Sequence, residues 1–277
     1  MAKLMKRFVR NKSLLLGSIL VVLVLVVTFA APLLARQDPQ KMEMAIRLQP
    51  PSALHWLGTD NFGRDLWSRI AFGARVSLST ALMVVLLSVC IGVTLGLVSG
   101  YYGGLIDAVI MRIVDIFLAF PVILLAIALV AVLGPSGRNV MIALGLVYWT
   151  QYARVVRSSV LAIKEEEFVS AAGALGAGDG RIIFRHILPN VIAPIIVLAT
   201  LGMGNAIVAE STLSFLGLGA QPPTPTWGYT LAFGMKFLQQ APHMSTYPGV
   251  AIMITVLGFN LLGDGLRDLL DPRLKNR

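Results

Sequence analysis

Long runs of apolar residues separated by short polar tracts set the pattern of this chain. The first run, residues 13–35, contains no charged residue and follows a tract rich in lysine and arginine. A helix that crosses the ~30 Å hydrocarbon core of a bilayer needs about 20 mainly apolar residues, whereas the apolar core of a cleavable signal peptide has about 7–15. We therefore expect a retained membrane span here, preceded by a cytoplasmic segment.

Five further runs predict an all-α integral membrane protein with six transmembrane helices. These runs cover residues 76–100, 106–133, 140–153, 191–213 and 248–262. The third and fifth of them are short and need flanking residues to cross the bilayer. Six crossings place the N- and C-termini on one side, and most of the 23 lysines and arginines fall in segments that this topology assigns to the cytoplasm.

The runs and loops also predict how the chain is organised. We expect a cytoplasmic tail over residues 1–12, a first span with its external loop over 13–75, a transmembrane core over 76–266 and a second cytoplasmic tail over 267–277. The core includes a cytoplasmic loop over 161–190 and an external loop over 217–247.

Composition supports the membrane assignment and removes other classes. The chain is 56% hydrophobic and only 13% charged, while a soluble domain averages about 25% charged residues. Its net charge of +9 sits at the ends of apolar runs and not in a stripe interleaved with aromatic residues, so we expect no nucleic-acid binding. The single cysteine, Cys90, lies in an apolar run and is expected to be buried and inert.

Motifs of catalysis and metal binding are missing from the sequence. There is no G-x-x-x-x-G-K-[ST], H-E-x-x-H, G-x-S-x-G or C-x-x-C, and the three histidines are scattered. We expect no catalytic residue, no metal site and no cofactor in this chain.

Ionisable residues inside spans are functional candidates by default. Arg112 and Asp115 are i, i+3 neighbours and are expected to pair with each other. Glu210 is the most isolated, so it is a candidate for the translocation path or for carrying protons. A structural carboxylate, bonded by Ser211 or Thr212 and facing a neighbouring helix, is the favoured alternative.

The external loops are expected to be ordered. Asp60, Arg64 and Asp65, between and beside two glycines, predict a folded turn with internal ion pairs. In the later loop, Trp227 and Tyr229 suit anchors at the outer membrane interface.

The cytoplasmic loop carries an apolar pattern of helical period. Phe168, Ala171, Ala172 and Leu175 form one stripe of a short helix that ends at the glycine-rich stretch beginning at Gly176. A second short helical turn is expected to present Phe184, Ile187 and Leu188 on one face and to be stopped by Pro189.

An exposed apolar helix face needs something to cover it. A groove on a partner, the subunit's own helix ends and the lipid interface are the alternatives. The small residues between Ala171 and Gly176 favour a partner groove, because they permit close backbone approach and cannot anchor in lipid.

The run SAAGALGAGDGRIIFRHILPN resembles the cytoplasmic motif of binding-protein-dependent ABC importer permeases. That motif has Glu-Ala-Ala, a Gly four positions after the second Ala, and a closing Leu-Pro. Here these positions are Ser170-Ala171-Ala172, Gly176 and Leu188-Pro189, with Ser170 in place of the usual Glu. LGTDNFGRDLWSRIAFGARVSL, GGLIDAVIMRIVDIFLAFP, SFLGLGAQPPTPTWG and GDGLRDLLDPRL are similar to segments of the dipeptide/oligopeptide/nickel branch.

The resemblance implies a machine with several subunits in a bacterial inner membrane. This chain would be the second of two homologous permease subunits and would form half of the translocation path. Two ATP-binding subunits would bind ATP and Mg²⁺, and a periplasmic or lipoprotein solute-binding protein would dock outside. The ATPase-coupling residues would be Ser170, Ala171, Ala172, Leu175, Gly176, Ile187, Leu188 and Pro189.

Di- or oligopeptides are the expected solute, and nickel, as a chelate, is the alternative within the same branch. A rival from another class is a secondary transporter, which would carry its own ion-coupling residues. The lack of charge clusters within the spans argues against it.

Overall fold

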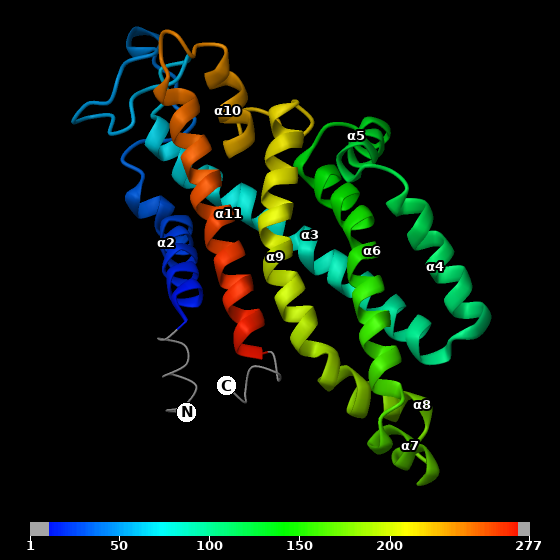
Figure 1. Cartoon of the computed structure of the whole chain (residues 1–277). Coiled ribbons are helices and arrows are strands. Elements are labelled where there is room, and N and C mark those ends of the chain that lie inside the picture. The colour runs from blue at the N-terminus through cyan, green and yellow to red at the C-terminus, as the bar shows by residue number, and fades with distance from the viewer. Residues whose placement is uncertain (1–10, 271–277) are drawn as a thin grey trace.

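Helices dominate the part of the chain that the structure describes, residues 11–270 of a computed structural model (Figure 1). Both predicted tails lie largely outside these residues. The elements are α2 (Lys12–Leu34), η1 (Met44–Ile46), α3 (Leu66–Tyr102), α4 (Gly104–Leu118), α5 (Val122–Leu133), α6 (Gly137–Lys164), α7 (Glu167–Ala174), α8 (Asp179–Arg181), η2 (Ile182–Ile187), α9 (Leu188–Phe215), α10 (Trp227–Met235) and α11 (His243–Leu270).

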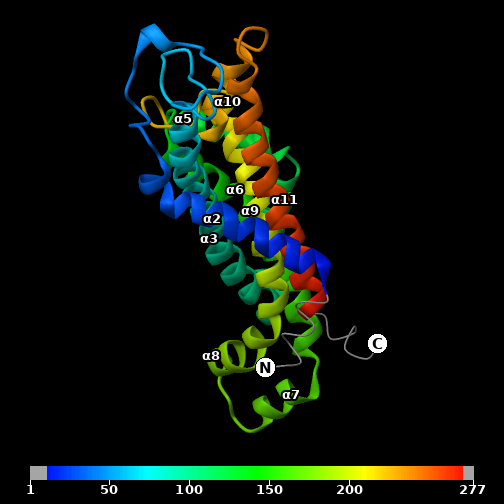
Figure 2. The same ribbon diagram turned by 90° about the vertical axis from the view of Figure 1, so that its left-hand side faces the viewer.

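The long helices run between two ends of an elongated bundle (Figures 1 and 2). At one end lie residues 35–65 and α10, which together we call the cap. At the other end lie α7, α8 and η2, and we call residues 165–187 the lobe. The start of α2 and the end of α11 meet on the lobe side of the bundle, where the Asn11 side-chain amide donates to the Asp268 carboxylate (3.1 Å).

Within residues 11–270, four helices are long and apolar enough to cross a membrane. They are Lys12–Leu34, Leu66–Tyr102, Asp179–Phe215 and His243–Leu270. A fifth candidate is the pair α4 and α5, which together are apolar enough but meet at a bend of 90°. The chain is therefore an all-helical membrane protein with four or five clear candidate spans.

The predicted run over 106–133 is not one straight helix. Pro121 precedes the first residue of α5, and a proline cannot supply the backbone N–H that would continue α4. The runs over 140–153 and 248–262 are the middles of longer helices, α6 and α11, each of 28 residues. Flanking polar residues therefore extend these helices, as their short apolar runs required.

The most extensive helix packing joins α3 to α6 along a row of glycines. A Cβ on Gly92 would lie 2.5 Å from the Trp149 carbonyl oxygen, and one on Gly96 would lie 2.7 Å from that of Ala153. Gly100 continues the row four residues later, against Val160. Small residues at i, i+4 and i+8 let two helix backbones approach closely, which is how helices associate where lipid removes the usual hydrophobic drive.

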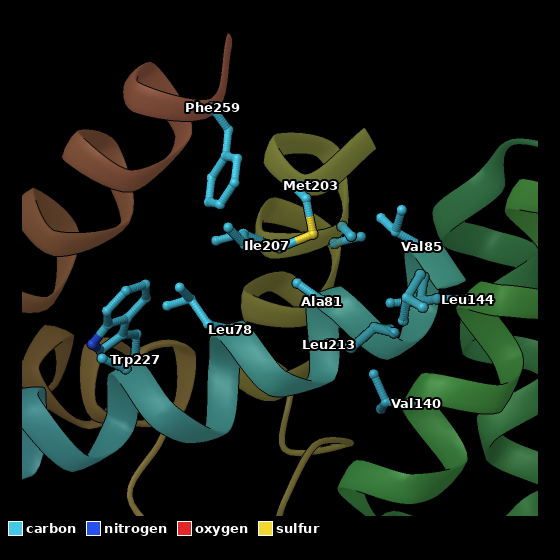
Figure 3. Close-up of a cluster of buried hydrophobic side chains, with 14 of the residues drawn as sticks. Leu78, Ala81, Val85, Val140, Leu144, Met203, Ile207, Leu213, Trp227 and Phe259 are labelled. Atoms are coloured by element: carbon cyan, nitrogen blue, oxygen red, sulfur yellow. The ribbon is translucent and has the colours of Figure 1, made fainter. Parts of the chain in front are cut away.

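Buried side chains of α3 and of six other helices meet around the first half of α3 (Figure 3). Leu78, Ala81 and Val85 of α3 point into this core, where Met203 and Ile207 of α9 meet them. Val140, Leu144, Leu213, Trp227 and Phe259 complete the labelled set. α3 is thus the central helix of the fold.

Two expectations about single residues are wrong. Trp227 is 2% exposed and donates its indole N–H to the Ile70 carbonyl (3.0 Å), so it is a core residue and not an interface anchor. The reason is that residues 227–235 form a helix, α10, which folds back over α3 and α9. Cys90 is exposed on the surface of α3.

The glycine row generates a prediction about stability. Gly96→Ala should lower the free energy of unfolding by about 1–3 kcal/mol, because the added methyl group overlaps backbone atoms of α6 that cannot move independently. The measurement is the thermal unfolding midpoint of the purified protein in detergent.

Gly249→Ala in α11 is the matched control, since a Cβ there meets only a Leu231 methyl group at 3.9 Å. Its midpoint should stay or rise, as alanine is the better helix former by up to ~1 kcal/mol. Equal effects of the two variants would contradict the packing role of Gly96.

Candidate functional site: the lobe and the faces of the bundle

Gly176 ends α7 through a hydrogen-bonded turn. The Gly176 N–H donates to the Gly173 carbonyl (2.9 Å), and the Ala177 N–H donates to the Ala172 carbonyl (3.1 Å). Gly176 has φ of +80°, the left-handed conformation that this C-terminal cap requires and that glycine adopts without strain. The predicted end of the short helix is therefore confirmed in its position and its geometry.

One side of the lobe is anchored to its own subunit. Val169 and Ala172 of α7 are buried, and so are Ile182, Ile183 and Ile187. Apart from Ala172, these side chains belong to a cluster with Leu97 of α3 and with Val156 and Val160 of α6. This apolar contact holds the lobe in a defined place beneath the ends of α3 and α6.

The other side of the lobe is bare. Leu175 is 89% exposed and Phe168 43% exposed, and both Ser170 and Ala171 are exposed as well. Gly173, Gly176, Gly178 and Gly180 all face open space, since a Cβ at any of them would have no neighbour within 4 Å. The predicted stripe is thus divided, with Ala172 turned inward and the rest turned outward.

The second predicted stripe is wrong in one residue. Phe184 is 68% exposed, whereas Ile187 is fully buried and Leu188 half-buried. Residues 182–187 form a π-helix, whose wider turn changes the angle between successive side chains. The spacing of an α-helix therefore does not apply here.

Pro189 does not stop a helix before the following span. α8, η2 and α9 form one helical run from Asp179 to Phe215, of 37 residues. Pro189 occupies the second position of α9, directly after the π turn, where the helix has already departed from its regular hydrogen bonding. Residues 179–187 of the lobe are thus continuous with a candidate membrane span, α9.

Tyr101, near the end of α3, ties the lobe to the bundle. Its hydroxyl donates to the Asp179 carboxylate at the start of α8 (2.9 Å). Its carbonyl accepts from the Lys164 ammonium at the end of α6 (2.7 Å). Three separate chain segments are therefore joined at one tyrosine.

Charged residues of α4 pair with α6 and not with each other. Asp115 accepts from Arg154 (2.8 Å), and Asp107 accepts two hydrogen bonds from Arg157 (both 2.5 Å). The predicted pairing of Asp115 with Arg112 is therefore wrong. The i, i+3 rule considers only partners on the same helix, so it could not predict a partner on α6. The observed contacts hold α4 against α6.

Glu210 lies inside the subunit and is 2% exposed. Its carboxylate accepts from the Ser214 hydroxyl (2.7 Å), and the Ser211 hydroxyl lies 3.5 Å away. Thr212, one of the two partners expected, instead bonds the backbone carbonyl of Val208.

The cap contains buried ion pairs, as the sequence predicts. Asp60 pairs with Arg64 (2.6 Å) and lies 3.5 Å from Arg69, with all three side chains at least 96% buried. Asp65 caps α3 by accepting from Ser68 N–H (2.8 Å), and it also contacts His55 (3.0 Å). The loop after α2 is therefore folded onto the end of α3.

Polar side chains in mid-span were missed by the sequence reasoning, which weighed only ionisable residues. Tyr148 and Gln151 of α6 and Asn205 of α9 line one hollow between these helices. An amide in the middle of an apolar run is the signal that could have revealed them.

These features together define a membrane protein with several spans, an ordered cap at one end and, at the other end, a lobe whose outward side is uncovered. Residues 92–276 match the family of binding-protein-dependent transport system inner membrane components. Residues 1–51 match the N-terminal transmembrane domain of oligopeptide transport permease C.

Curated relatives agree along nearly the whole chain. The dipeptide transport system permease protein DppC of Alkalihalophilus pseudofirmus is 51% identical over 98% of this chain and 89% of its own length. The glutathione transport system permease proteins GsiD of Pectobacterium atrosepticum and Escherichia coli are 44% and 45% identical, over 98% of this chain and 90% and 89% of their own lengths.

The chain belongs to the family of inner-membrane permease subunits of binding-protein-dependent ABC importers. Members of this family are not themselves catalytic, so the expectation that this chain is no enzyme is confirmed, as is its place in the inner membrane. Family membership implies a complex with a solute-binding protein and ATPases. It excludes the alternative that this chain is a secondary transporter.

Glu210 provides a test of its own role. Glu210→Gln keeps an oxygen that can accept from Ser214, so we expect normal assembly and import within about twofold of the unchanged complex. Solute uptake by cells and the amount of assembled complex in their membranes are the two measurements. Complete loss of uptake with normal assembly would place Glu210 in the path.

Proposed function

We propose that this chain forms half of the translocation path of an ATP-driven importer of di- and oligopeptides. The observation that carries the proposal is the 51% identity to a dipeptide permease over 98% of the chain, together with a lobe that is fixed on one side and bare on the other. The names of the glutathione permeases also describe a small peptide as the solute.

The proposed coupling element is the outward side of the lobe, seated in a groove of an ATP-binding subunit. Ser170, Ala171 and Gly176 permit close approach there, and Leu175 offers an apolar anchor. Ala172 and Ile187 would act from the inward side by holding the lobe in place, and Leu188 and Pro189 would begin the attached span. ATP and Mg²⁺ would be bound in that partner, and a second permease would complete the path.

Six crossings are the topology we propose. α6 would be the remaining span, because 28 residues at 1.5 Å each give about 42 Å, more than the ~30 Å of hydrocarbon. Its polar residues would be tolerated, since α6 packs against α3 and α9 inside the subunit. Both tails and the loop over 161–190 would then be cytoplasmic, and the division into segments 1–12, 13–75, 76–266 and 267–277 follows.

The cap would be external in this topology and would receive the solute-binding protein. Its buried ion pairs around Asp60 and the hydrogen bonds of Asp65 with Ser68 and His55 support this role, because they keep the loop after α2 in one shape. A preorganised surface loses little conformational entropy on docking.

The proposed topology can be tested by cysteine labelling. In a Cys90→Ser background, Arg138→Cys at the start of α6 should react with a membrane-impermeant thiol reagent added to intact cells lacking the outer membrane. Glu165→Cys, just past the end of α6, should react only after the membrane is opened. Labelling of both from the same side would show that α6 does not cross.

Import itself is tested with the complete complex in lipid vesicles. We expect ATP-dependent accumulation of a labelled dipeptide when the solute-binding protein is present. Nickel with a chelator, supplied instead, should not accumulate. Leu175→Asp should abolish import and release the ATP-binding subunits, because a charge would have to be buried in the groove that receives this leucine.

Leu238→Asp is the matched control, since Leu238 is another exposed leucine (47%) but lies beside the cap. It should leave attachment of the ATP-binding subunits unchanged. Normal import by Leu175→Asp would refute the coupling role of the lobe, and accumulation of nickel but not dipeptide would refute the proposed solute.

A further inference from the structure

A furrow runs along α9 on the side that lies between α6 and α11. Two hollows make it, and both are lined by Leu198. The larger hollow, of about 520 Å³, is lined mainly by apolar side chains of α9 and reaches Arg267 and Leu270 near the end of α11. The smaller one, of only about 10 Å³ in this single subunit, lies between α3, α6 and α9.

Polar side chains without partners gather at the inner hollow. Tyr148, Gln151 and Asn205 line it, and Asn260 of α11 faces α9 one residue before Asn205, at Gly204, where its side-chain oxygen would be 2.9 Å from an added Cβ. Asn205 and Asn260 are exposed, and the other two are half-buried. Among residues 11–270, the structure records no hydrogen bond from any of these four side chains, whereas neighbouring Tyr152 and Ser88 bond backbone carbonyls of α9 and α6.

All four side chains lie at mid-span. Along the axis each is within about 6 Å of the middle of its helix, at 1.5 Å per residue. At that depth, an amide or phenol that faces hydrocarbon with no hydrogen-bond partner costs several kcal/mol. These side chains therefore do not face lipid in the assembled protein.

The side of α9 opposite Asn205 exposes apolar side chains, as expected of a surface that packs against lipid or other apolar groups. Ile196 is nine residues from Asn205, which places it about 180° around the helix. Ile192 and Ile196 are both exposed and apolar. The two sides of this span thus differ in polarity, and the furrow lies on the side that carries Asn205.

We propose that this furrow is the wall that the subunit contributes to the solute path, and that its ring of uncharged polar groups hydrogen-bonds the peptide bonds of the passing solute. This inference rests on the proposed function and extends it to named residues. Peptide groups are the common feature of all short peptides, and each offers one donor and one acceptor. The inner hollow is lined by no acidic or basic residue, so it would admit peptides of either charge.

The same ring disfavours a bare divalent cation. The inner hollow offers a solute amide, phenol and hydroxyl groups that donate and accept hydrogen bonds, but no carboxylate or imidazole that would coordinate a metal. The chemistry of the furrow therefore agrees with a peptide as solute and not with a free metal ion.

The first experiment is water accessibility in the complete complex, in a Cys90→Ser background. Asn205→Cys should react with a small membrane-impermeant thiol reagent, and Ile196→Cys, on the opposite side of α9, should not. A purely structural Asn205 would not give this difference. The labelling needs no solute, so it distinguishes a wrong furrow from a wrong solute.

The second experiment is peptide import into vesicles, with ATP hydrolysis measured in parallel. Asn205→Leu and Gln151→Leu should each lower import at least tenfold while the binding protein still stimulates ATP hydrolysis. Thr200→Val is the control on the same helix, because the Thr200 hydroxyl is already bonded to the Ile196 carbonyl (2.9 Å), and it should import normally.

Labelling of Asn205→Cys together with loss of import in the leucine variants supports the furrow as the path. An unreactive Asn205→Cys, or normal import by both leucine variants, overturns it. If the unchanged complex imports no peptide although Asn205→Cys is labelled, the fault lies in the proposed solute and not in the position of the path.

Discussion

Close approach of α3 and α6 is the contact on which the rest of the structure depends. Gly92, Gly96 and Gly100 remove the side chains that would hold these helices apart, so that backbone meets backbone over about two turns. In lipid, apolar surface gains nothing by leaving its surroundings, and dispersion contacts between close helices replace the hydrophobic drive. With α3 fixed against α6, α9 packs on both of them, and the core of Figure 3 follows.

A second glycine contact joins α2 to α11 in the same way. A Cβ on Gly265 would lie 2.6 Å from the Leu14 Cα atom, and one on Gly258 would lie 3.0 Å from the Leu20 Cβ. Polar contacts fix the two ends: the ion pairs around Asp60 in the cap, and Tyr101 with Lys164 and Asp179 above the lobe. The middle of the bundle is held by close packing together with contacts between helices such as those of Ser88 with the Gly145 carbonyl and Asp115 with Arg154.

Much of the fold could be predicted from the sequence, because a span must be apolar along its whole length. The runs over 76–100 and 191–213 lie within helices, the run over 13–35 ends one residue past α2, and the glycine that ends α7 was identified by its place after a periodic stripe. The family followed from short motifs. Features that depend on residues far apart in the sequence were not predicted. Asp115 pairs with Arg154 on another helix, and Trp227 is buried in the core as part of α10.

The short helices of the lobe were predictable in their location, but the course of the second one was not. Helical spacing placed Phe184 with Ile187, and the π turn between residues 182 and 187 separates them. The bend at Pro121 and the continuity of the helix through Pro189 show two outcomes for one residue type. At Pro121 the preceding helix has already ended, so the chain bends. At Pro189 a π turn leads directly into α9, so the helix continues. Only the surrounding backbone decides between these outcomes.

The helical run from Asp179 to Phe215 is longer than the bilayer is thick, so part of it extends beyond the membrane. A rod of 37 helical residues is about 55 Å long, so roughly 25 Å of it extends past a ~30 Å hydrocarbon layer. Tilting such a rod by about 5° about one end displaces the other end by roughly 5 Å. A small tilt of the protruding end would thus move Asn205 and its neighbours sideways, and the π turn at residues 182–187 and Pro194 inside α9 are places along the run where it can bend.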